Sequence, residues 1–320
     1  MNLKSIKSKI LERKKIERNE ALFLIDAPLD ELCQSADEIR KKFCGNNLDM
    51  CTVIDEKSGK CSEDCKFCAQ SAHYNGVVES HSLFSTDILL KDAEYNYNKG
   101  VPTYGLVTAG RKLQKDEILE VSESIKILND KIKMKYCASF GLLEEEELQI
   151  LKNAGIKKIH NNLETSEGFF PSLCTTHTFS DKVKTIKAAQ KIGLEVCSGG
   201  IFGVGESMED RIDLAFSLSQ LEIKSIPINF LNPIKGTPFE DYKVIPKEDA
   251  LRIIAIFRFI NPDSFIKLSG GRALVKGDKE MLQSGANAVI TGDLLTTTGT
   301  KIIDDIKLIT ELGYIVQGGF

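Results

Sequence analysis

The chain has 320 residues, of which 42% are hydrophobic and 28% are charged, values close to those of soluble globular proteins. Its formal charge of −4 and its pI of about 5.8 give no overall attraction to phosphate backbones, so nucleic acid is not expected as a partner. The basic N-terminus lacks the apolar core of a secretory signal, and no apolar stretch is long enough to span a bilayer. We therefore expect a cytoplasmic protein without membrane contact.

The predicted elements repeat one unit, in which a helix ends at a glycine and an apolar, β-rich segment follows at once. Residues 1–45 are expected to form a helical extension, and residues 46–320 a single domain. Glycine suits the left-handed conformation that ends a helix, and it occupies this seam at Gly100, Gly155, Gly193 and Gly285. The expected strands are 51–54, 103–107, 133–138, 157–160, 194–198, 225–229, 265–268 and 288–291, and the expected helices are 87–99, 115–128, 145–153, 181–192, 207–221 and 247–260.

Eight strands that alternate with helices indicate an α/β fold, a closed parallel (β/α)8 barrel of the TIM type. A doubly wound open sheet is the alternative, but the number of strands and the spacing of the units favour the barrel. In such a barrel, the chemistry lies at the C-terminal ends of the strands and in the loops after them.

Three of the nine cysteines form a C-x3-C-x2-C pattern in the loop after the first strand, within KSGKCSEDCKFCAQSAHY: Cys61, Cys65 and Cys68. Cysteine thiolates hold iron–sulfur clusters, and three of them leave one iron of a cubane open, as catalytic metal sites require. The pattern therefore predicts a [4Fe–4S] cluster that cleaves S-adenosylmethionine to start radical chemistry. A zinc site is the alternative, but zinc favours four ligands in paired CxxC units.

Further segments carry a more specific resemblance, namely KYCASFG, HNNLETS, KVKTIKAAQKIGLEVCSGGIFGVGE, SIPINFLNPIKGTPF, IKLSGGR and DLLTTTG. Together with the cysteine loop, they make the chain resemble biotin synthase over nearly all of its length after residue 25. The resemblance implies a radical S-adenosylmethionine barrel enzyme, a sulfurtransferase that converts dethiobiotin to biotin. It also implies a second iron–sulfur cluster as sulfur donor, a low-potential flavodoxin or ferredoxin as electron donor, and a homodimer. A cluster carrier without catalysis would leave HNNLETS and GGIFGVGE unexplained.

The resemblance also implies roles for individual residues. The cysteine triplet would hold the cubane, whose open iron binds the methionine part of S-adenosylmethionine. The other implied contacts to S-adenosylmethionine are Phe67, Gly203 and Gly205 at the adenine, Thr108 and Ala109 at the methionyl group, Asn162 and Glu164 at the ribose, and Lys182 at the carboxylate. For dethiobiotin, the implied contacts are Asn162 and Asn229 at the ureido ring, and Thr296 and Thr297 at the carboxylate.

The chain departs from the family at the second cluster, a [2Fe–2S] unit that familiar biotin synthases hold with three cysteines and an arginine. Cys137 and Cys197 match that pattern, but Gly105 replaces the third cysteine and Lys267 replaces the arginine. In one interpretation the second cluster is absent, and the chain is a related radical enzyme of the hydrogenase-maturation or mutase type that acts on another small molecule. In another, the two cysteines are buried apolar residues.

A third interpretation, a rebuilt second cluster, is favoured by the strand positions. The four side chains of one layer in a barrel come from alternate strands. Cys51, Cys137, Cys197 and Lys267 lie on the first, third, fifth and seventh expected strands. We therefore expect a second iron–sulfur cluster on these three cysteines, with Lys267 as ligand or counter-charge. Gly105 leaves room for a cluster larger than [2Fe–2S].

The remaining cysteines, Cys33, Cys44 and Cys174, have no matched role and are expected to be structural or surface thiols, with Cys44 a reserve candidate for the second cluster. The four histidines show no metal-ligand spacing, so a structural role is expected for each of them: His73, His81, His160 and His177.

Overall fold

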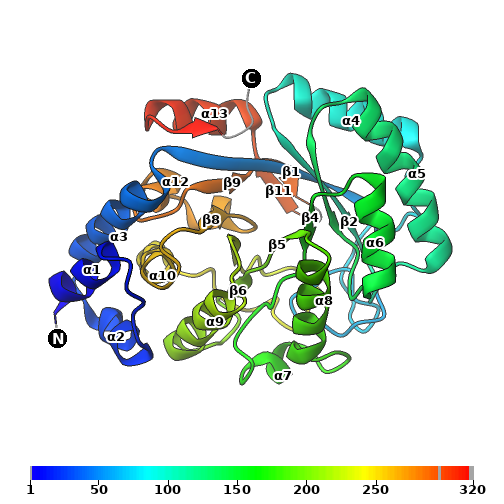
Figure 1. Ribbon diagram of the computed structural model, residues 1–320. Coiled ribbons are helices and arrows are strands. Elements are labelled where there is room, and N and C mark those ends of the chain that lie inside the picture. The colour runs from blue at the N-terminus through cyan, green and yellow to red at the C-terminus, as the bar shows by residue number, and fades with distance from the viewer. Residues whose placement is uncertain (1, 295–296, 317–320) are drawn as a thin grey trace.

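The protein is described by a computed structural model, which covers residues 2–294 and 297–316. Its eight main strands are all parallel and form a barrel, since the last of them pairs with the first through Met50 and Val289. The predicted TIM-type barrel is confirmed (Figure 1). The strands are β1 (Asn47–Lys57), β2 (Thr103–Thr108), β3 (Lys135–Ser139), β4 (Lys158–His160), β5 (Glu195–Cys197), β7 (Ser225–Phe230), β8 (Phe265–Leu268) and β9 (Ala288–Ile290).

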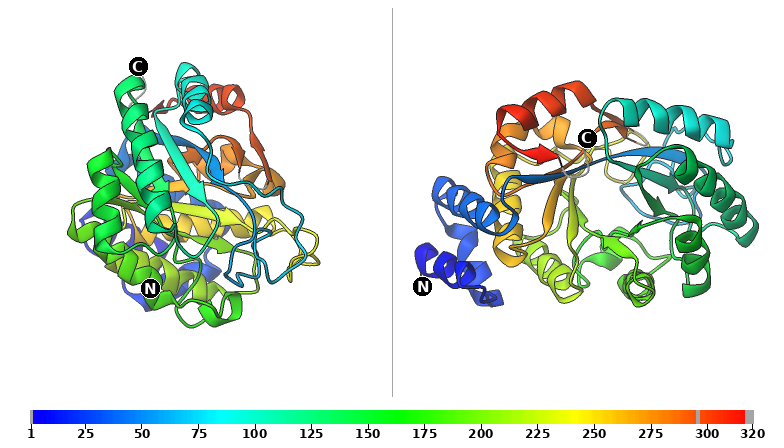
Figure 2. Two further views of the ribbon diagram at one scale, coloured as in Figure 1. Left: turned by 90° about the vertical axis from the view of Figure 1, so that its right-hand side faces the viewer. Right: turned by 45° about the horizontal axis from the view of Figure 1, so that its top comes forward.

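The six predicted helices surround the strands, as Figure 2 shows from two further sides. Their bounds are α4 (Thr86–Asn98), α5 (Lys115–Lys131), α6 (Glu145–Ala154), α8 (Phe179–Lys191), α9 (Met208–Gln220) and α10 (Lys247–Ile260). Each buries an apolar stripe; in α5 the stripe includes Ile118, Val121 and Ile125. The glycines at the seams have positive φ, for example 112° at Gly155 and 77° at Gly193, as predicted.

Helices before β1 cover one side of the barrel: α1 (Leu3–Leu11), α2 (Arg18–Phe23), the 3-10 helix η1 (Leu24–Asp26) and α3 (Leu29–Cys44). Helix α10 packs between α3 and α9, which explains why its residues from Ile253 to Ile260 are all buried. Within the described residues, no helix combines the length and the apolar character that a membrane crossing requires.

Several short elements were not predicted. Strand β6 (Gly200–Phe202) pairs with β7, and β12 (Ile315–Val316) extends the sheet beside β1. A hairpin of β10 (Gly292–Leu294) and β11 (Thr297–Thr300) follows β9, and α13 (Ile302–Glu311) follows the hairpin. The remaining short helices are α7 (Phe170–Leu173), α11 (Arg272–Val275) and α12 (Asp278–Leu282).

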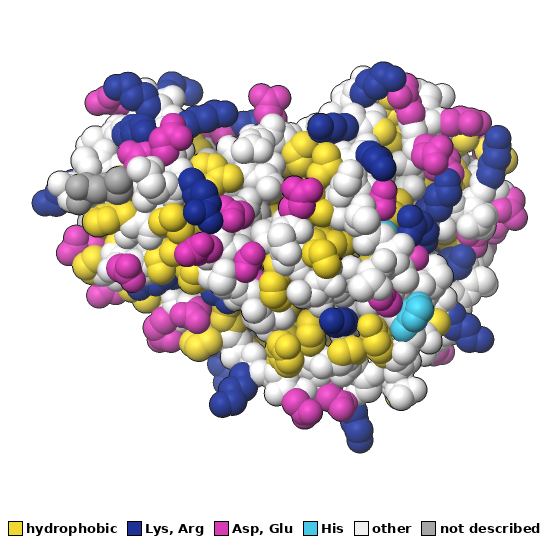
Figure 3. Space-filling model, turned by 90° about the horizontal axis from the view of Figure 1, so that it is seen from below, with side chains coloured by type: hydrophobic (Ala, Val, Ile, Leu, Met, Phe, Trp, Pro, Cys, Tyr) yellow, Lys and Arg dark blue, Asp and Glu magenta, His cyan; other side chains and the backbone are white. Residues whose placement is uncertain are grey.

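The outer surface carries charges of both signs. On the face seen in Figure 3, acidic and basic side chains are interspersed, and neither sign forms a continuous patch. This distribution agrees with the small net charge of the chain.

Candidate active site

The cysteine triplet lies in the loop after β1, at the C-terminal end of the barrel. Hydrogen bonds within the loop fix its shape: the Cys61 N–H donates to the Gln70 carbonyl at 2.8 Å, and the Ala72 N–H donates to the Cys61 carbonyl at 2.8 Å. The Cys68 N–H donates to the Cys65 carbonyl at 3.0 Å. All three thiols are free and only partly buried. The loop thus presents three available thiols where barrel enzymes carry out their chemistry.

The sulfur of Cys68 has the surroundings of an iron–sulfur ligand. Burial raises the pKa of this thiol to about 11, although the backbone N–H groups of Gln70 and Ser71 donate to the sulfur. For Cys65, a hydrogen bond with Cys174 and then burial raise the pKa of the thiol. Both thiols therefore keep their protons until a metal replaces them, and the N–H donors then stabilise the thiolate.

Glu164 has an uncommon backbone conformation beside this loop. Its φ is 70°, in the left-handed region, and this strain costs about 1–3 kcal/mol. Two hydrogen bonds hold it there: the Glu164 N–H donates to the Gly199 carbonyl at 3.0 Å, and the Ile201 N–H donates to the Glu164 carbonyl at 2.8 Å. Such strain is typical of functional positions.

A cation faces this carboxyl group. Burial raises the pKa of Glu164, and Lys182, in the first turn of α8, lowers it. Lys182 also acts electrostatically on Cys65, and Glu164 acts on Cys68. The structure therefore places the two predicted S-adenosylmethionine contacts close enough to the cysteine loop to interact with it electrostatically.

Two asparagine amides hold the glycine-rich backbone of this region. The Asn162 side-chain oxygen accepts from the Gly199 N–H at 3.0 Å. The Asn229 amide donates to the Gly200 carbonyl at 3.0 Å and accepts from the Gly270 N–H at 3.0 Å. An amide offers two donors and two acceptor positions, so each side chain retains capacity for a ligand.

The predicted adenine contacts lie around a small apolar cluster of Leu173, Val204, Leu231 and Phe239, against which Phe67 packs. Gly203 and Gly205 flank Val204 and have φ values of 90° and 98°. The Glu206 carboxylate accepts from the N–H groups of Gly203 at 2.9 Å and Val204 at 2.8 Å, and Arg211 donates to it at 2.7 Å. The Gly203 N–H is thus engaged, and a ligand would meet this loop through its remaining backbone atoms. Glu206, which shapes the loop, was not among the residues predicted from the sequence.

The other predicted ligand contacts are at the strand ends. Thr108 ends β2, and the Ala109 N–H donates to the Lys57 carbonyl at 2.7 Å, which extends the β1–β2 pairing. Thr296 lies outside the described residues, and Thr297 begins β11.

A second group of thiols lies inside the barrel. Cys51 is on β1, Cys137 on β3 and Cys197 on β5, and the three thiols interact electrostatically with one another. The Lys267 ammonium, on β8, donates to the Cys51 sulfur at 3.2 Å. Gly105 pairs with Cys137 in register, and a Cβ added to it would meet the Val53 side chain at 3.1 Å. The structure therefore brings these residues together, with little space for a side chain at position 105.

Positive charge dominates the surroundings of these thiols. Burial raises the pKa of Cys197, but Lys267, His160 and Lys158 outweigh burial and lower the pKa to about 6. Burial raises the pKa values of the other two thiols, Cys51 and Cys137. His160, for which a purely structural role was expected, hydrogen-bonds Cys197, and Lys158 was not identified at all. Such an electropositive site favours bound thiolates.

Lys267 is itself paired with Asp49, whose carboxylate lies 2.8 Å from its ammonium. Burial lowers the pKa of Lys267, but Asp49 and the neighbouring thiols raise it well above its usual value. Burial raises the pKa of Asp49, but Lys267 and Lys158 lower it to about 2. The pair is therefore charged, and Lys267 acts as a donor. Asp49 lies two residues before Cys51 and therefore on the same face of β1. This two-residue spacing could have identified Asp49 from the sequence as a neighbour of the site.

A further segment, residues 173–177 after α7, holds the cysteine loop in place. The Asp64 carboxylate accepts from the N–H groups of Thr175 at 2.8 Å and Thr176 at 3.1 Å, and the Lys66 N–H donates to the Leu173 carbonyl at 3.0 Å. Both Asp64 and Lys66 flank Cys65. The sequence analysis gave this segment no role, since these contacts join residues more than a hundred positions apart.

Two sequence families match the chain: the radical SAM superfamily over residues 56–218, and the biotin and thiamin synthesis associated domain over residues 227–315. The biotin synthase of Brachyspira hyodysenteriae is 51% identical over 99% of this chain and 96% of that protein. The biotin synthase of Alkaliphilus metalliredigens is 46% identical, over 98% of this chain and 99% of that protein.

Among solved structures, methylornithine synthase superposes with a TM-score of 0.84 at 19% identity, over 97% of this chain and 96% of that one. The FeFe-hydrogenase maturase HydG from Carboxydothermus hydrogenoformans superposes with a TM-score of 0.82 at 14% identity, over 98% of this chain and 78% of that one. At these identities the two structures share the fold with this chain.

Proposed function

The chain belongs to the biotin synthase family of radical S-adenosylmethionine enzymes, and we propose that it inserts sulfur into dethiobiotin with the two groups of cysteines described above. It is thus an enzyme of the sulfurtransferase class. The alternative of a hydrogenase-maturation or mutase enzyme has no support beyond the fold, since the hydrogenase maturase HydG is 14% identical to this chain. The curated biotin synthases, at 46% and 51%, are much closer.

In this proposal, Cys61, Cys65 and Cys68 hold the [4Fe–4S] cluster that binds S-adenosylmethionine. The cluster and its bound cofactor, once reduced, supply a carbon radical that removes hydrogen from the substrate. Two features make the loop suitable for an iron–sulfur cluster: its three free thiols, and the N–H groups that donate to the Cys68 sulfur. We expect a low-potential flavodoxin or ferredoxin to supply the electron, and a homodimer as the assembly.

The residues around the loop would bind and orient S-adenosylmethionine. Lys182 provides a positive charge for the methionine carboxylate, and Glu164 and Asn162 accept from ribose hydroxyls. Phe67 and the Gly203–Gly205 loop provide an apolar wall for the adenine, and Thr108 and Ala109 border the methionyl group. What supports this arrangement is the electrostatic contact of Lys182 with both Glu164 and Cys65.

The second group would hold the cluster that supplies the sulfur, with Cys51, Cys137 and Cys197 as ligands. The observation that carries this assignment is the 3.2 Å contact between the Cys51 sulfur and the Lys267 ammonium. Lys267 pairs with the Asp49 carboxylate at 2.8 Å, which favours its protonated form in the absence of a cluster. We therefore assign Lys267 as a counter-charge and hydrogen-bond donor, and not as a ligand.

Dethiobiotin would lie between the two cysteine groups. The amides of Asn162 and Asn229 can each donate to and accept from its ureido ring, as a urea requires. Thr296 and Thr297 are proposed contacts for its carboxylate. The closed barrel would keep other hydrogen donors, such as the C–H bonds of neighbouring side chains, away from the carbon radical.

Anaerobic turnover tests the proposed reaction. Reconstituted protein, given dethiobiotin, S-adenosylmethionine and a low-potential reductant, should release 5′-deoxyadenosine, methionine and biotin. Release of 5′-deoxyadenosine without biotin or a thiolated intermediate would contradict the proposed substrate.

A further inference from the structure

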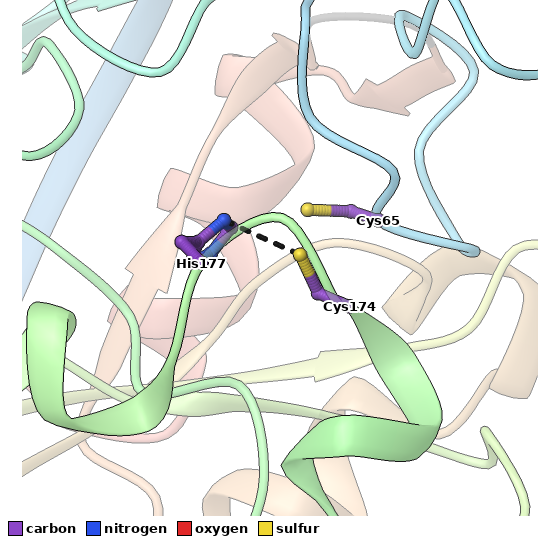
Figure 4. Close-up of side chains that lie close together, drawn as sticks. All are labelled: Cys65, Cys174 and His177. Atoms are coloured by element: carbon purple, nitrogen blue, oxygen red, sulfur yellow. Dashed lines mark hydrogen bonds between the residues drawn. The ribbon is translucent and has the colours of Figure 1, made fainter.

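Three metal-binding side chains meet behind the cysteine loop, as Figure 4 shows. They are Cys65 in that loop, and Cys174 and His177 in the segment after α7. One donor atom from each lies within 4.8 Å of the other two. The Cys174 sulfur is 3.3 Å from Nδ1 of His177. Only Cys65 has a role in the proposed reaction, so the other two residues need a separate explanation.

We propose that Cys65, Cys174 and His177 hold one divalent transition-metal ion, of the zinc type, in protein that lacks the radical cluster. Zinc binds thiolate sulfur at about 2.3 Å and imidazole nitrogen at about 2.0–2.1 Å in a tetrahedron, which places such donors roughly 3.5 Å apart. The observed sulfur–nitrogen distance of 3.3 Å agrees with this geometry. On binding, the ion displaces the thiol protons of both cysteines to solvent, and no electron is transferred.

The site is enclosed, as a metal site with thiolate ligands requires. Cys174 is 3% exposed and His177 is 7% exposed. Two acidic side chains adjoin the donors: Oδ1 of Asp64 lies 3.1 Å from the Cys174 sulfur, and Oε2 of Glu63 lies 2.6 Å from Nδ1 of His177. Carboxylates this close favour a divalent cation. Asp64 or a water molecule would complete the tetrahedron.

Metal binding replaces the hydrogen bonds that the donor atoms now make, namely those of Cys174 with Asp64 and His177 and that of His177 with Glu63. Nδ1 of His177 must exchange Glu63 for the ion, while Glu63 keeps Thr176 at 3.0 Å and Arg111 at 3.2 Å as partners. The segment that carries Cys174 and His177 is already fixed to Asp64 through Thr175. The donor atoms are therefore already in position before the ion binds, and the segment needs little further ordering on binding.

Cys65 belongs to both sites, so the single ion and the radical cluster exclude each other. The ion holds Cys65 toward Cys174 and keeps it from the cubane. This exclusion rests on the proposed function, because it requires Cys65 to be a cluster ligand. The binding of the ion requires neither cluster nor S-adenosylmethionine. The metal-binding experiment therefore gives a clear result even if the protein does not catalyse the proposed reaction.

The test uses the full chain, stripped of iron anaerobically and titrated with Co²⁺ alone, whose absorption reports tetrahedral thiolate ligands. Wild-type protein and Cys61→Ala should both bind Co²⁺ with thiolate charge-transfer bands. Because Cys51, Cys137 and Cys197 can also bind Co²⁺ in stripped protein, the number of bound ions is compared. Cys174→Ser and His177→Gln should each bind one Co²⁺ fewer than wild type and show weaker bands, while Cys33→Ser should match wild type. Serine retains the size and polarity of Cys174, and equal thermal unfolding midpoints will show that the variants fold.

Two results would overturn the proposal. One is a number of bound Co²⁺ ions in Cys174→Ser and His177→Gln that equals the number in wild type. The other is binding abolished by Cys61→Ala, since the ion would then sit on the cysteine triplet.

Discussion

The ammonium of Lys267 lies 3.2 Å from the sulfur of Cys51 and donates a hydrogen bond to it, although the two residues are 216 positions apart. Closure of the barrel makes this contact possible, because β9 pairs with β1 and brings β8 close to the start of the sheet. A positive charge and a thiol thus meet inside the barrel, beside two further cysteines.

Replacing Lys267 with methionine should separate its two candidate roles. As a counter-charge, its loss should lower the reduction potential of the second cluster, because net charge and hydrogen bonds to sulfur set that potential. The iron content should stay at the wild-type level. Anaerobic iron analysis and redox titration check this, and a loss of second-cluster iron equal to that of Cys51→Ala would instead identify Lys267 as a ligand.

Replacing Lys182 with methionine should weaken the binding of S-adenosylmethionine. A hydrogen bond to a charged group contributes about 1.5–3 kcal/mol, so the dissociation constant should rise about 10- to 150-fold. Equilibrium binding to reconstituted protein measures this change. Lys184→Met is the matched control, because Lys184 is exposed on the same helix and pairs with Asp181. Equal affinities in the two variants would refute the assigned contact.

Asp64 should stabilise the radical cluster through the loop that carries Cys65. Asp64→Asn exchanges one carboxylate oxygen for a donor, so the hydrogen bonds from Thr175 and Thr176 weaken. We expect the [4Fe–4S] cluster to be lost several-fold faster to a chelator, while second-cluster iron is retained. The time course of absorbance loss measures this, with exposed Asp241→Asn as control. Identical rates of cluster loss in both variants would show that the hydrogen bonds of Asp64 with Thr175 and Thr176 do not stabilise the cluster.

The sequence predicted the main elements of the barrel because the helices show a periodic apolar pattern and because a glycine marks the seam before four of the strands, β2, β4, β5 and β9. It did not predict β6 or the β10–β11 hairpin, which follow another strand directly and no helix, nor the two-residue strand β12. The lengths of the main strands were also uncertain, and β1 extends from Asn47 to Lys57, well beyond the predicted 51–54.

Residues of the site could be predicted where their position on a strand or within a single motif fixes their location. Alternate strands placed Cys51 and Lys267 in one layer, and the loop motif located the cysteine triplet. The remaining residues depend on contacts that only folding creates. Glu206 acts through the backbone of its own loop, and the segment with Cys174 and His177 reaches Cys65 across the barrel mouth, so no spacing in the sequence marks them.

Glu56 should make the stability of the protein depend on pH. Its side chain is 1% exposed, and burial, together with the nearby Glu120, raises its pKa from 4.5 to about 8. Between these values the folded state binds more protons than the unfolded state, so the free energy of unfolding should fall as the pH rises. Glu56→Gln should remove the contribution of Glu56 to this decrease in the free energy of unfolding. Urea unfolding at several pH values measures it, and parallel curves for both proteins would exclude the effect.

The central claim is that Cys51 supplies a ligand of the second cluster in place of the cysteine that Gly105 replaces. The direct measurement is the iron and sulfide content of anaerobically reconstituted Cys51→Ala, compared with wild type and with Cys33→Ala. The account predicts that Cys51→Ala loses the second cluster, keeps the radical cluster and still cleaves S-adenosylmethionine, whereas Cys33→Ala matches wild type. Full second-cluster content in Cys51→Ala would contradict it.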